Sequence, residues 1–139
     1  MVEQLGWDGY FLKDFVKSLK VDGGSIVHTP DQAKRWVERM LEYRDELEGG
    51  ICIRRVEDFL PDSECRYFVL QGVPHAPDDR PIPTPVQVAT QRVHSPFFTV
   101  DTAMTTSGSE RIVELGDGQV SDLVGWTAER FAQLWPAGK

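Results

Sequence analysis

The segment from residue 97 to residue 118 constrains the fold more than any other part of this chain. Phe97–Met104 is rich in aromatic and β-branched residues, Thr105–Ser109 is polar, and Arg111–Leu115 is again strand-like. Two such runs joined by a short polar segment predict a β-hairpin, and Gly116-Asp117-Gly118 predicts a turn after it. Because a hairpin is antiparallel, we expect this half of the chain to contain no parallel βαβ units.

The first half of the chain combines strands with one well-marked helix. Strands are predicted over Gly9–Val16, continuing to Lys20, and over Ser25–His28, Ile51–Val56 and Glu64–Gln71. Thr29 is a good N-cap, Pro30 suits the first helical position, and Gln32 completes a capping box. Apolar residues then follow at the spacing of one helical face, at Ala33, Trp36, Val37, Met40 and Leu41.

The second half adds a shorter helix and one segment of undecided structure. The predicted first helix ends before Gly49-Gly50, and Thr127–Trp135 predicts a second one. Pro74–Pro85 contains five prolines and predicts an exposed loop, whereas Val86–Arg92 fits a strand or a helix equally well. The whole order predicts an α+β fold with antiparallel sheet and packed helices.

Composition excludes several classes of protein. With 40% hydrophobic and 27% charged residues, the 139-residue chain is expected to be globular and not disordered. A net charge of −7 without a basic patch argues against nucleic-acid binding. No apolar run reaches the roughly 18 residues of a membrane span, and no signal peptide is recognised, so we expect a cytoplasmic protein. Cys52 and Cys65 are therefore expected to be reduced, and the three scattered histidines do not suggest zinc.

Carboxylates in the predicted hairpin are candidate metal ligands. Asp101 lies in its first strand, Glu114 lies in its second, and Asp117 lies in the following turn. Carboxylates on adjacent strands are able to converge on one cation, and Mg²⁺ takes one or two of them together with phosphates and water. The alternative is that Asp101 and Glu114 are polar residues on a half-exposed sheet.

Basic residues inside predicted strands are candidate phosphate contacts. Lys13 interrupts an apolar strand, where it either extends to the surface or reaches a phosphate. Arg54 lies within another strand. Glu64 and Arg66 are two positions apart and share one sheet face, so they either pair with each other or leave Arg66 directed at an anion. The sequence contains neither a P-loop nor a G-x-S-x-G elbow.

Four blocks in order resemble a small clade of ATP-grasp domains found in bacteria and phages. They are Tyr10–Ser18 (YFLKDFVKS), Gly50–Arg54 (GICIR), Glu64–Val69 (ECRYFV), and Val100-Asp101 followed by Ile112–Ser121 (IVELGDGQVS). The resemblance spans nearly the whole chain. It implies two small lobes, a lysine-strand lobe over residues 1–60 and a metal-binding lobe over residues 61–139, with ATP in the cleft between them.

The resemblance also implies roles for individual residues. Lys13 and Lys17 lie in the block that would contact the nucleotide phosphates, and the segment from Arg54 to Glu57 would pass the adenine and ribose. Arg66 would face the phosphates or an acyl-phosphate, so Arg66 and Arg54 are the candidate catalytic residues. Mg²⁺ would be held by Asp101 and Glu114, with Asp117 in place of the asparagine common in ATP-grasp enzymes.

Family chemistry implies an ATP-dependent carboxylate–amine ligase that joins amino acids or peptides through an acyl-phosphate. The N-terminal domain that usually precedes an ATP-grasp domain is not recognised, so we expect either a minimal form or a homodimer that completes its site. The alternative is a non-catalytic descendant, an interaction or immunity-type module that keeps the fold. In both cases the expected partners are small molecules or proteins, with no nucleic acid and no membrane.

Overall fold

The computed structural model describes residues 5–14, 24–43 and 49–135 of the chain. The chain divides into two compact units, unit 1 over Met1–Glu57 and unit 2 over Asp58–Lys139. The sequence suggests a division after residue 60, but Asp58–Leu60 is attached to unit 2. The Leu60 amide donates to the carbonyl of Met104 at 2.8 Å, and the Thr106 amide donates to that of Asp58 at 2.9 Å.

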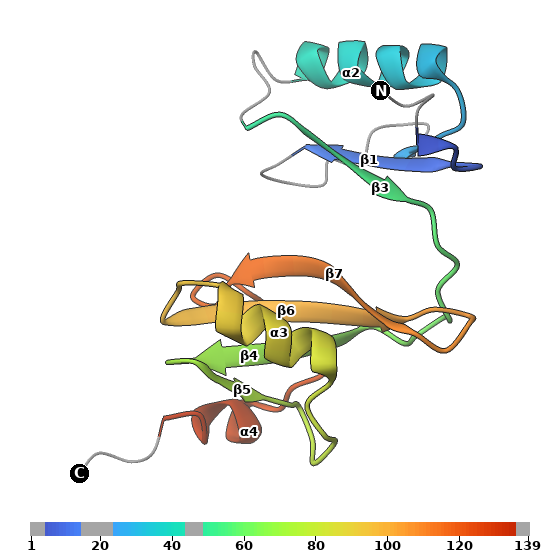
Figure 1. The fold of residues 1–139 in the computed structure, drawn as a ribbon. Coiled ribbons are helices and arrows are strands. Elements are labelled where there is room, and N and C mark those ends of the chain that lie inside the picture. The colour runs from blue at the N-terminus through green and yellow to red at the C-terminus, as the bar shows by residue number, and fades with distance from the viewer. Residues whose placement is uncertain (1–4, 15–23, 44–48, 136–139) are drawn as a thin grey trace. The chain divides into compact units, whose positions relative to one another are not determined.

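Unit 1 is a three-stranded antiparallel sheet covered on one face by a helix (Figure 1). Strand β1 (Tyr10–Asp14) lies at the centre, between β2 (Ile26–Val27) and β3 (Ile51–Arg55), and helix α2 spans Pro30–Tyr43. Its core joins alternate β1 residues to the apolar helix face and consists of Tyr10, Leu12, Val27, Trp36 and Met40. The predicted strands and helix of this unit are confirmed, and Lys17–Lys20 lies outside the described residues.

Helix α2 begins close to the predicted N-cap. The Thr29 hydroxyl accepts from the Gln32 amide at 3.2 Å, and the Thr29 carbonyl accepts from the Ala33 amide at 3.0 Å. The Gln32 side chain accepts from the backbone N–H of His28 at 2.7 Å and not from that of Thr29. The predicted capping box is therefore displaced by one residue, although the same two side chains satisfy amides at the helix start.

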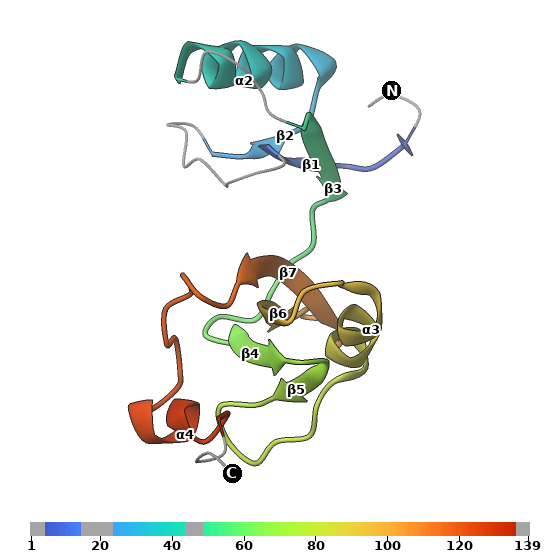
Figure 2. The same cartoon turned by 90° about the vertical axis from the view of Figure 1, so that its left-hand side faces the viewer.

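Unit 2 is a four-stranded antiparallel sheet in the order β5-β4-β6-β7 (Figures 1 and 2). The strands are β4 (Cys65–Leu70), β5 (Val73–His75), β6 (Phe97–Met104) and β7 (Glu110–Asp117). The predicted β6–β7 hairpin is confirmed, but β7 continues through Gly116-Asp117, where the sequence suggests a turn. Gly116 suits this position because a Cβ there would lie 2.6 Å from Oγ1 of Thr99.

Each face of the unit 2 sheet has its own apolar core. On one face, Tyr67, Val69 and Val100 pack with helix α3 (Thr84–Arg92) through Val86 and Ala89. On the other face, Phe68 contacts Trp126 and Phe131, at ring-centroid distances of 5.1 and 4.9 Å. Phe131 belongs to helix α4 (Ala128–Ala132), so the C-terminal segment closes this second face.

Two expectations for the proline-rich region are corrected or resolved. Pro74 is part of β5, an edge strand, where a missing backbone donor is tolerated. The undecided segment Val86–Arg92 is helical, because Pro85 lies in the first turn of α3, where no N–H is needed. Among the helices of the described residues, none has the length and apolar composition of a membrane span.

Candidate functional site

A row of charged side chains crosses three strands of the unit 2 sheet. Arg66 in β4 is the register partner of Asp101 in β6, and Asp101 is the register partner of Glu114 in β7. Directly paired residues of antiparallel strands project from the same face, so these three side chains lie side by side. We call Arg66, Asp101 and Glu114 the charged row.

The centre of the charged row is a two-pronged ion pair. Nε of Arg66 donates to Oδ1 of Asp101 at 2.8 Å, and Nη2 donates to Oδ2 at 2.6 Å. The Asp101 side chain is 3% exposed and that of Arg66 is 15% exposed. The hydrogen bonds to Asp101 raise the pKa of Arg66, with further contributions from Glu114 and Asp122. Arg66 therefore pairs with Asp101 and not with Glu64, the other partner that the sequence offers.

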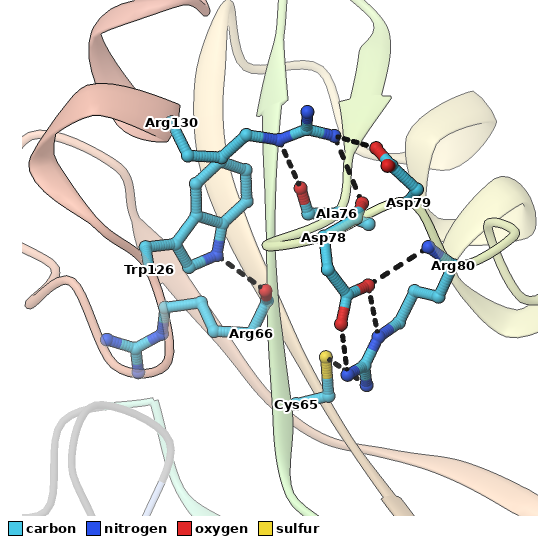
Figure 3. Close-up of polar contacts among 8 residues, drawn as sticks. All are labelled: Cys65, Arg66, Ala76, Asp78, Asp79, Arg80, Trp126 and Arg130. Carbon is cyan, nitrogen blue, oxygen red and sulfur yellow. Dashed lines mark hydrogen bonds and ion pairs between the residues drawn. The ribbon is translucent and has the colours of Figure 1, made fainter.

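Arg66 also attaches the charged row to the C-terminal segment. Its Nη1 donates to the backbone carbonyl of Asp122 at 2.8 Å, and its own carbonyl accepts from Nε1 of Trp126 at 2.9 Å. Figure 3 shows the Trp126 contact and shows the Arg66 and Cys65 side chains on opposite sides of β4. The segment that follows β7 is thus fixed beside the charged row at two points.

A groove of about 320 Å³ adjoins the charged row at Glu114. It has an apolar part and an acidic rim, and its lining residues are Phe59, Leu60, Asp62, Ser63, Glu64, Ala103, Val113 and Glu114. Glu64 and Ala103 are two positions from Arg66 and Asp101, so they belong to the same face of the sheet. Its volume lies near the lower end of the roughly 300–1,000 Å³ typical of small-molecule sites.

The wall of this groove formed by residues 58–63 is held in place by backbone contacts. Phe59 forms an isolated bridge with Thr105, and the Ser63 hydroxyl donates to the Leu60 carbonyl at 2.7 Å. The same hydroxyl accepts from the Met104 amide at 3.1 Å. The Asp58–Ser63 segment is therefore ordered against the end of β6, which gives the groove a fixed shape.

In unit 1, Lys13 and Arg54 lie on the sheet face opposite the apolar core. Tyr10 and Leu12 point into that core, so the alternation along β1 directs Lys13 away from α2. Lys13 pairs in register with Cys52, and Arg54 pairs with Phe11, so all four residues share one face. Lys13 is half-buried and Arg54 is exposed. This arrangement presents two cations beside an aromatic ring.

The other predicted site residues are placed differently. Lys17 lies outside the described residues. Glu57 is half-buried at the end of unit 1, directly after β3. Asp117 pairs in register with Phe98, whose side chain belongs to the α3 core, and Oδ1 of Asp117 accepts from the Gln119 amide at 2.9 Å. The charged row therefore does not include Asp117, whose role as a metal ligand stays a prediction.

The donor set of the charged row fits Mg²⁺ if phosphates complete the coordination. Asp101 and Glu114 offer carboxylate oxygens from adjacent strands, which are the ligands that Mg²⁺ prefers. Within the described residues, no group of three or more His, Cys, Asp or Glu side chains is placed to hold a metal. Mg²⁺ commonly binds one or two carboxylates plus substrate phosphates, so two are sufficient.

A second polar cluster lies on the α3 side of the same sheet (Figure 3). Arg80 donates to both oxygens of Asp78, at 2.7 and 2.6 Å, and its Nη1 lies 3.2 Å from Sγ of Cys65. This pairing lowers the pKa of Asp78 to about 2, while burial raises the pKa of the Cys65 thiol. Cys65 is therefore a protonated, buried thiol at neutral pH, which agrees with a structural role.

Arg130 fixes the proline-rich loop to helix α4. It donates to the carbonyls of Ala76 and Asp78, at 3.4 and 3.0 Å, and pairs with Asp79 at 3.4 Å (Figure 3). Burial lowers the pKa of nearby His75, and the charge of Arg130 lowers it further. The loop expected to be merely exposed is thus ordered by two arginines.

We expect His75 to make this protein sensitive to mild acid. Because its folded-state pKa is lowered, the unfolded chain binds the proton more readily, so stability is lost as pH falls below about 6.5. His75→Gln should flatten the decrease in melting temperature between about pH 7 and pH 5 relative to the wild type. His94→Gln, at an exposed position, is the control. Equal slopes for the two variants would contradict the prediction.

Asp122 and Trp126 are residues near the charged row that the sequence does not single out. Asp122 contacts Arg66 through a backbone carbonyl, an interaction that no residue type encodes. Trp126 carried a usable signal, because a buried indole usually requires an acceptor. The register of β4 against β6 was needed to identify that acceptor.

The fold and the charged row define a class of protein: an α+β chain of two antiparallel-sheet units, with paired carboxylates and an arginine on an open sheet face. A family model described as an ATP-grasp domain, the third family of its clade, matches residues 4–136. The chain therefore belongs to this clade of ATP-grasp domains, which confirms the resemblance and the fold class. This membership indicates an ATP-binding, ligase-type function, and ATP-grasp domains usually also bind Mg²⁺. Neither a curated protein nor a solved structure matches the chain.

Proposed function

We propose that this protein is an ATP-dependent carboxylate–amine ligase that works through an acyl-phosphate. Its substrates in this proposal are amino acids, peptides or other small molecules that carry a carboxylate or an amine. The observation that carries the proposal is the charged row, in which two carboxylates and one arginine meet beside a groove in a chain of the ATP-grasp family.

The groove is the proposed place of the nucleoside. Its Phe59 and Leu60 side chains offer apolar contact for a base, and the carboxylates of Glu64 and Glu114 are able to accept hydrogen bonds from ribose hydroxyls. Glu57 precedes this segment directly and would lie near the base. The acidic rim by itself disfavours phosphates, so their charge has to be neutralised by cations.

Those cations are the proposed role of the remaining residues. Asp101 and Glu114 would hold Mg²⁺, which neutralises phosphate charge when it is bound. Lys13 and Arg54 share one face of the unit 1 sheet and would contact the phosphates, with Lys17 as an additional contact. Arg66 would donate to the γ-phosphoryl group and then to the acyl-phosphate. Catalysis would then depend on positioning and on charge stabilisation.

The proposed reaction has two steps. An oxygen of the substrate carboxylate attacks the γ-phosphorus of ATP, and the bond to the β-phosphate oxygen breaks, which releases ADP and leaves an acyl-phosphate. The nitrogen of an amine then attacks the acyl carbon, and inorganic phosphate leaves as the amide bond forms. The amine loses a proton to solvent in this second step.

Trapping of the acyl-phosphate tests this proposal. Protein, Mg-ATP and hydroxylamine are incubated with panels of amino acids and short peptides, and both hydroxamate and ADP are measured. We expect carboxylate-dependent ADP formation that falls at least about tenfold in Lys13→Ala, because a phosphate-contacting charge is lost. Lys34→Ala, on the exposed side of α2, is the matched control.

The outcomes separate the ligase from the non-catalytic alternative. ADP formation that requires no carboxylate, or that is equal in Lys13→Ala and Lys34→Ala, would contradict the proposed mechanism. Nucleotide binding without hydroxamate for any carboxylate in the panels would favour an interaction module that retains the fold.

A further inference from the structure

The ion pair at the centre of the charged row occupies the oxygens that a metal would need. Both carboxylate oxygens of Asp101 accept hydrogen bonds from Arg66, at 2.8 and 2.6 Å. Apart from these bonds, the carboxylate is enclosed by protein, because its side chain is 3% exposed. A cation therefore cannot reach Asp101 while Arg66 keeps both contacts.

We propose that Arg66 is a metal-gated arginine, which holds Asp101 in the nucleotide-free protein and transfers to the phosphate when the metal–nucleotide complex binds. This inference rests on the proposed function, because it assigns Asp101 to the metal and Arg66 to the phosphate. It adds a coupling between the two residues that neither role requires by itself.

Charge and geometry support the exchange in both directions. Without a ligand, separating Arg66 from Asp101 would leave two poorly hydrated charges unpaired, which is costly. With Mg-nucleotide present, the cation replaces the guanidinium beside Asp101, and a phosphate oxygen replaces the carboxylate beside Arg66. Mg²⁺ and guanidinium repel each other at such distances, so simultaneous occupation is disfavoured.

Neighbouring contacts leave Arg66 able to turn toward a ligand. Its third bonded nitrogen, Nη1, donates to the exposed backbone carbonyl of Asp122, a contact near the surface. Glu114, on the far side of Asp101, is exposed and lines the groove. A ligand in the groove would therefore approach Asp101 from the side of Glu114, and Arg66 would be displaced toward the open end of the row.

The gate predicts that removing Arg66 improves metal binding in the absence of nucleotide. Free Mn²⁺, a paramagnetic substitute for Mg²⁺, is titrated with protein and followed by electron paramagnetic resonance. We expect Arg66→Gln to bind Mn²⁺ at least about tenfold more tightly than the wild type, because Asp101 becomes available. Arg92→Gln removes one positive charge from an exposed position of the same unit and should behave as the wild type.

The double variant Arg66→Gln/Asp101→Asn locates the effect. We expect it to lose the gain in Mn²⁺ affinity, because the freed carboxylate is absent. The gate is wrong if Arg66→Gln binds no more tightly than Arg92→Gln, or if the gain persists in the double variant. This titration contains no nucleotide, so its result does not depend on whether the chain is a ligase.

Nuclear magnetic resonance on the wild type keeps the test decisive if Arg66→Gln does not fold. The Nε–H signal of Arg66, assigned with Arg66→Lys, should shift on addition of saturating Mg-ADP and remain in place with Mg²⁺ alone. Mg-ADP that binds without moving this signal would overturn the gate and leave the nucleotide site intact. An absence of Mg-ADP and Mg-ATP binding would contradict the proposed function itself.

Discussion

Replacing Asp101 with alanine is expected to lower the free energy of unfolding by about 3–5 kcal/mol, the cost of leaving a buried charge without its partner. Asp101 is 2% exposed and accepts two charge-assisted hydrogen bonds from Arg66. The alanine variant would strand the guanidinium in a site where its side chain is only 15% exposed. Urea denaturation followed by circular dichroism measures the change.

Glu114→Ala is the matched comparison for this effect. Glu114 is the register partner of Asp101 but is exposed, so its removal should alter stability by no more than about 0.5 kcal/mol. Similar losses in the two variants would mean that Arg66 and Asp101 do not form the buried pair described here.

Glu114→Ala is expected to have its large effect on nucleotide binding. If Glu114 is one of two carboxylates that hold the metal, its loss should weaken Mg-ATP affinity by about 100-fold or more, at the upper end of effects seen for groups that merely support metal ligands. The fold should be unaffected, because the side chain is exposed. Isothermal titration calorimetry at fixed Mg²⁺ concentration provides the measurement.

Asp117→Ala serves as the control within the same strand. Its carboxylate accepts from the Gln119 amide and lies opposite Phe98, outside the charged row. We therefore expect its Mg-ATP affinity to remain within about threefold of the wild type, a free-energy change below about 1 kcal/mol. Equal losses in Glu114→Ala and Asp117→Ala would show that the row does not define the metal site.

Local signals in the sequence predict much of the fold. Thr29, Pro30 and Gln32 mark the start of α2 because capping depends on residues only a few positions apart. The β6–β7 hairpin is predictable for the same reason, since a short polar segment joins two strand-like runs. Strand β5 was missed because its prolines suggest a loop, and proline is acceptable there only because the strand lies at a sheet edge.

The candidate site was predictable in its residue types but not in its pairing. A family-like order of motifs singles out Arg66, Asp101 and Glu114 without showing which of them touch. Arg66 and Asp101 are 35 positions apart, and the nearer acid Glu64 is an equally plausible partner from spacing alone. The β4–β6 register decides between them, and it depends on packing over the whole sheet.

The most direct test of the central claim is the equilibrium binding of ATP to the wild-type chain with Mg²⁺ and with excess chelator. The account predicts saturable binding with a dissociation constant below about 1 mM in the presence of Mg²⁺, the upper end of usual substrate affinities, and at least about tenfold weaker binding without it. Absence of heat at millimolar Mg-ATP, or equal binding with and without the metal, would contradict it.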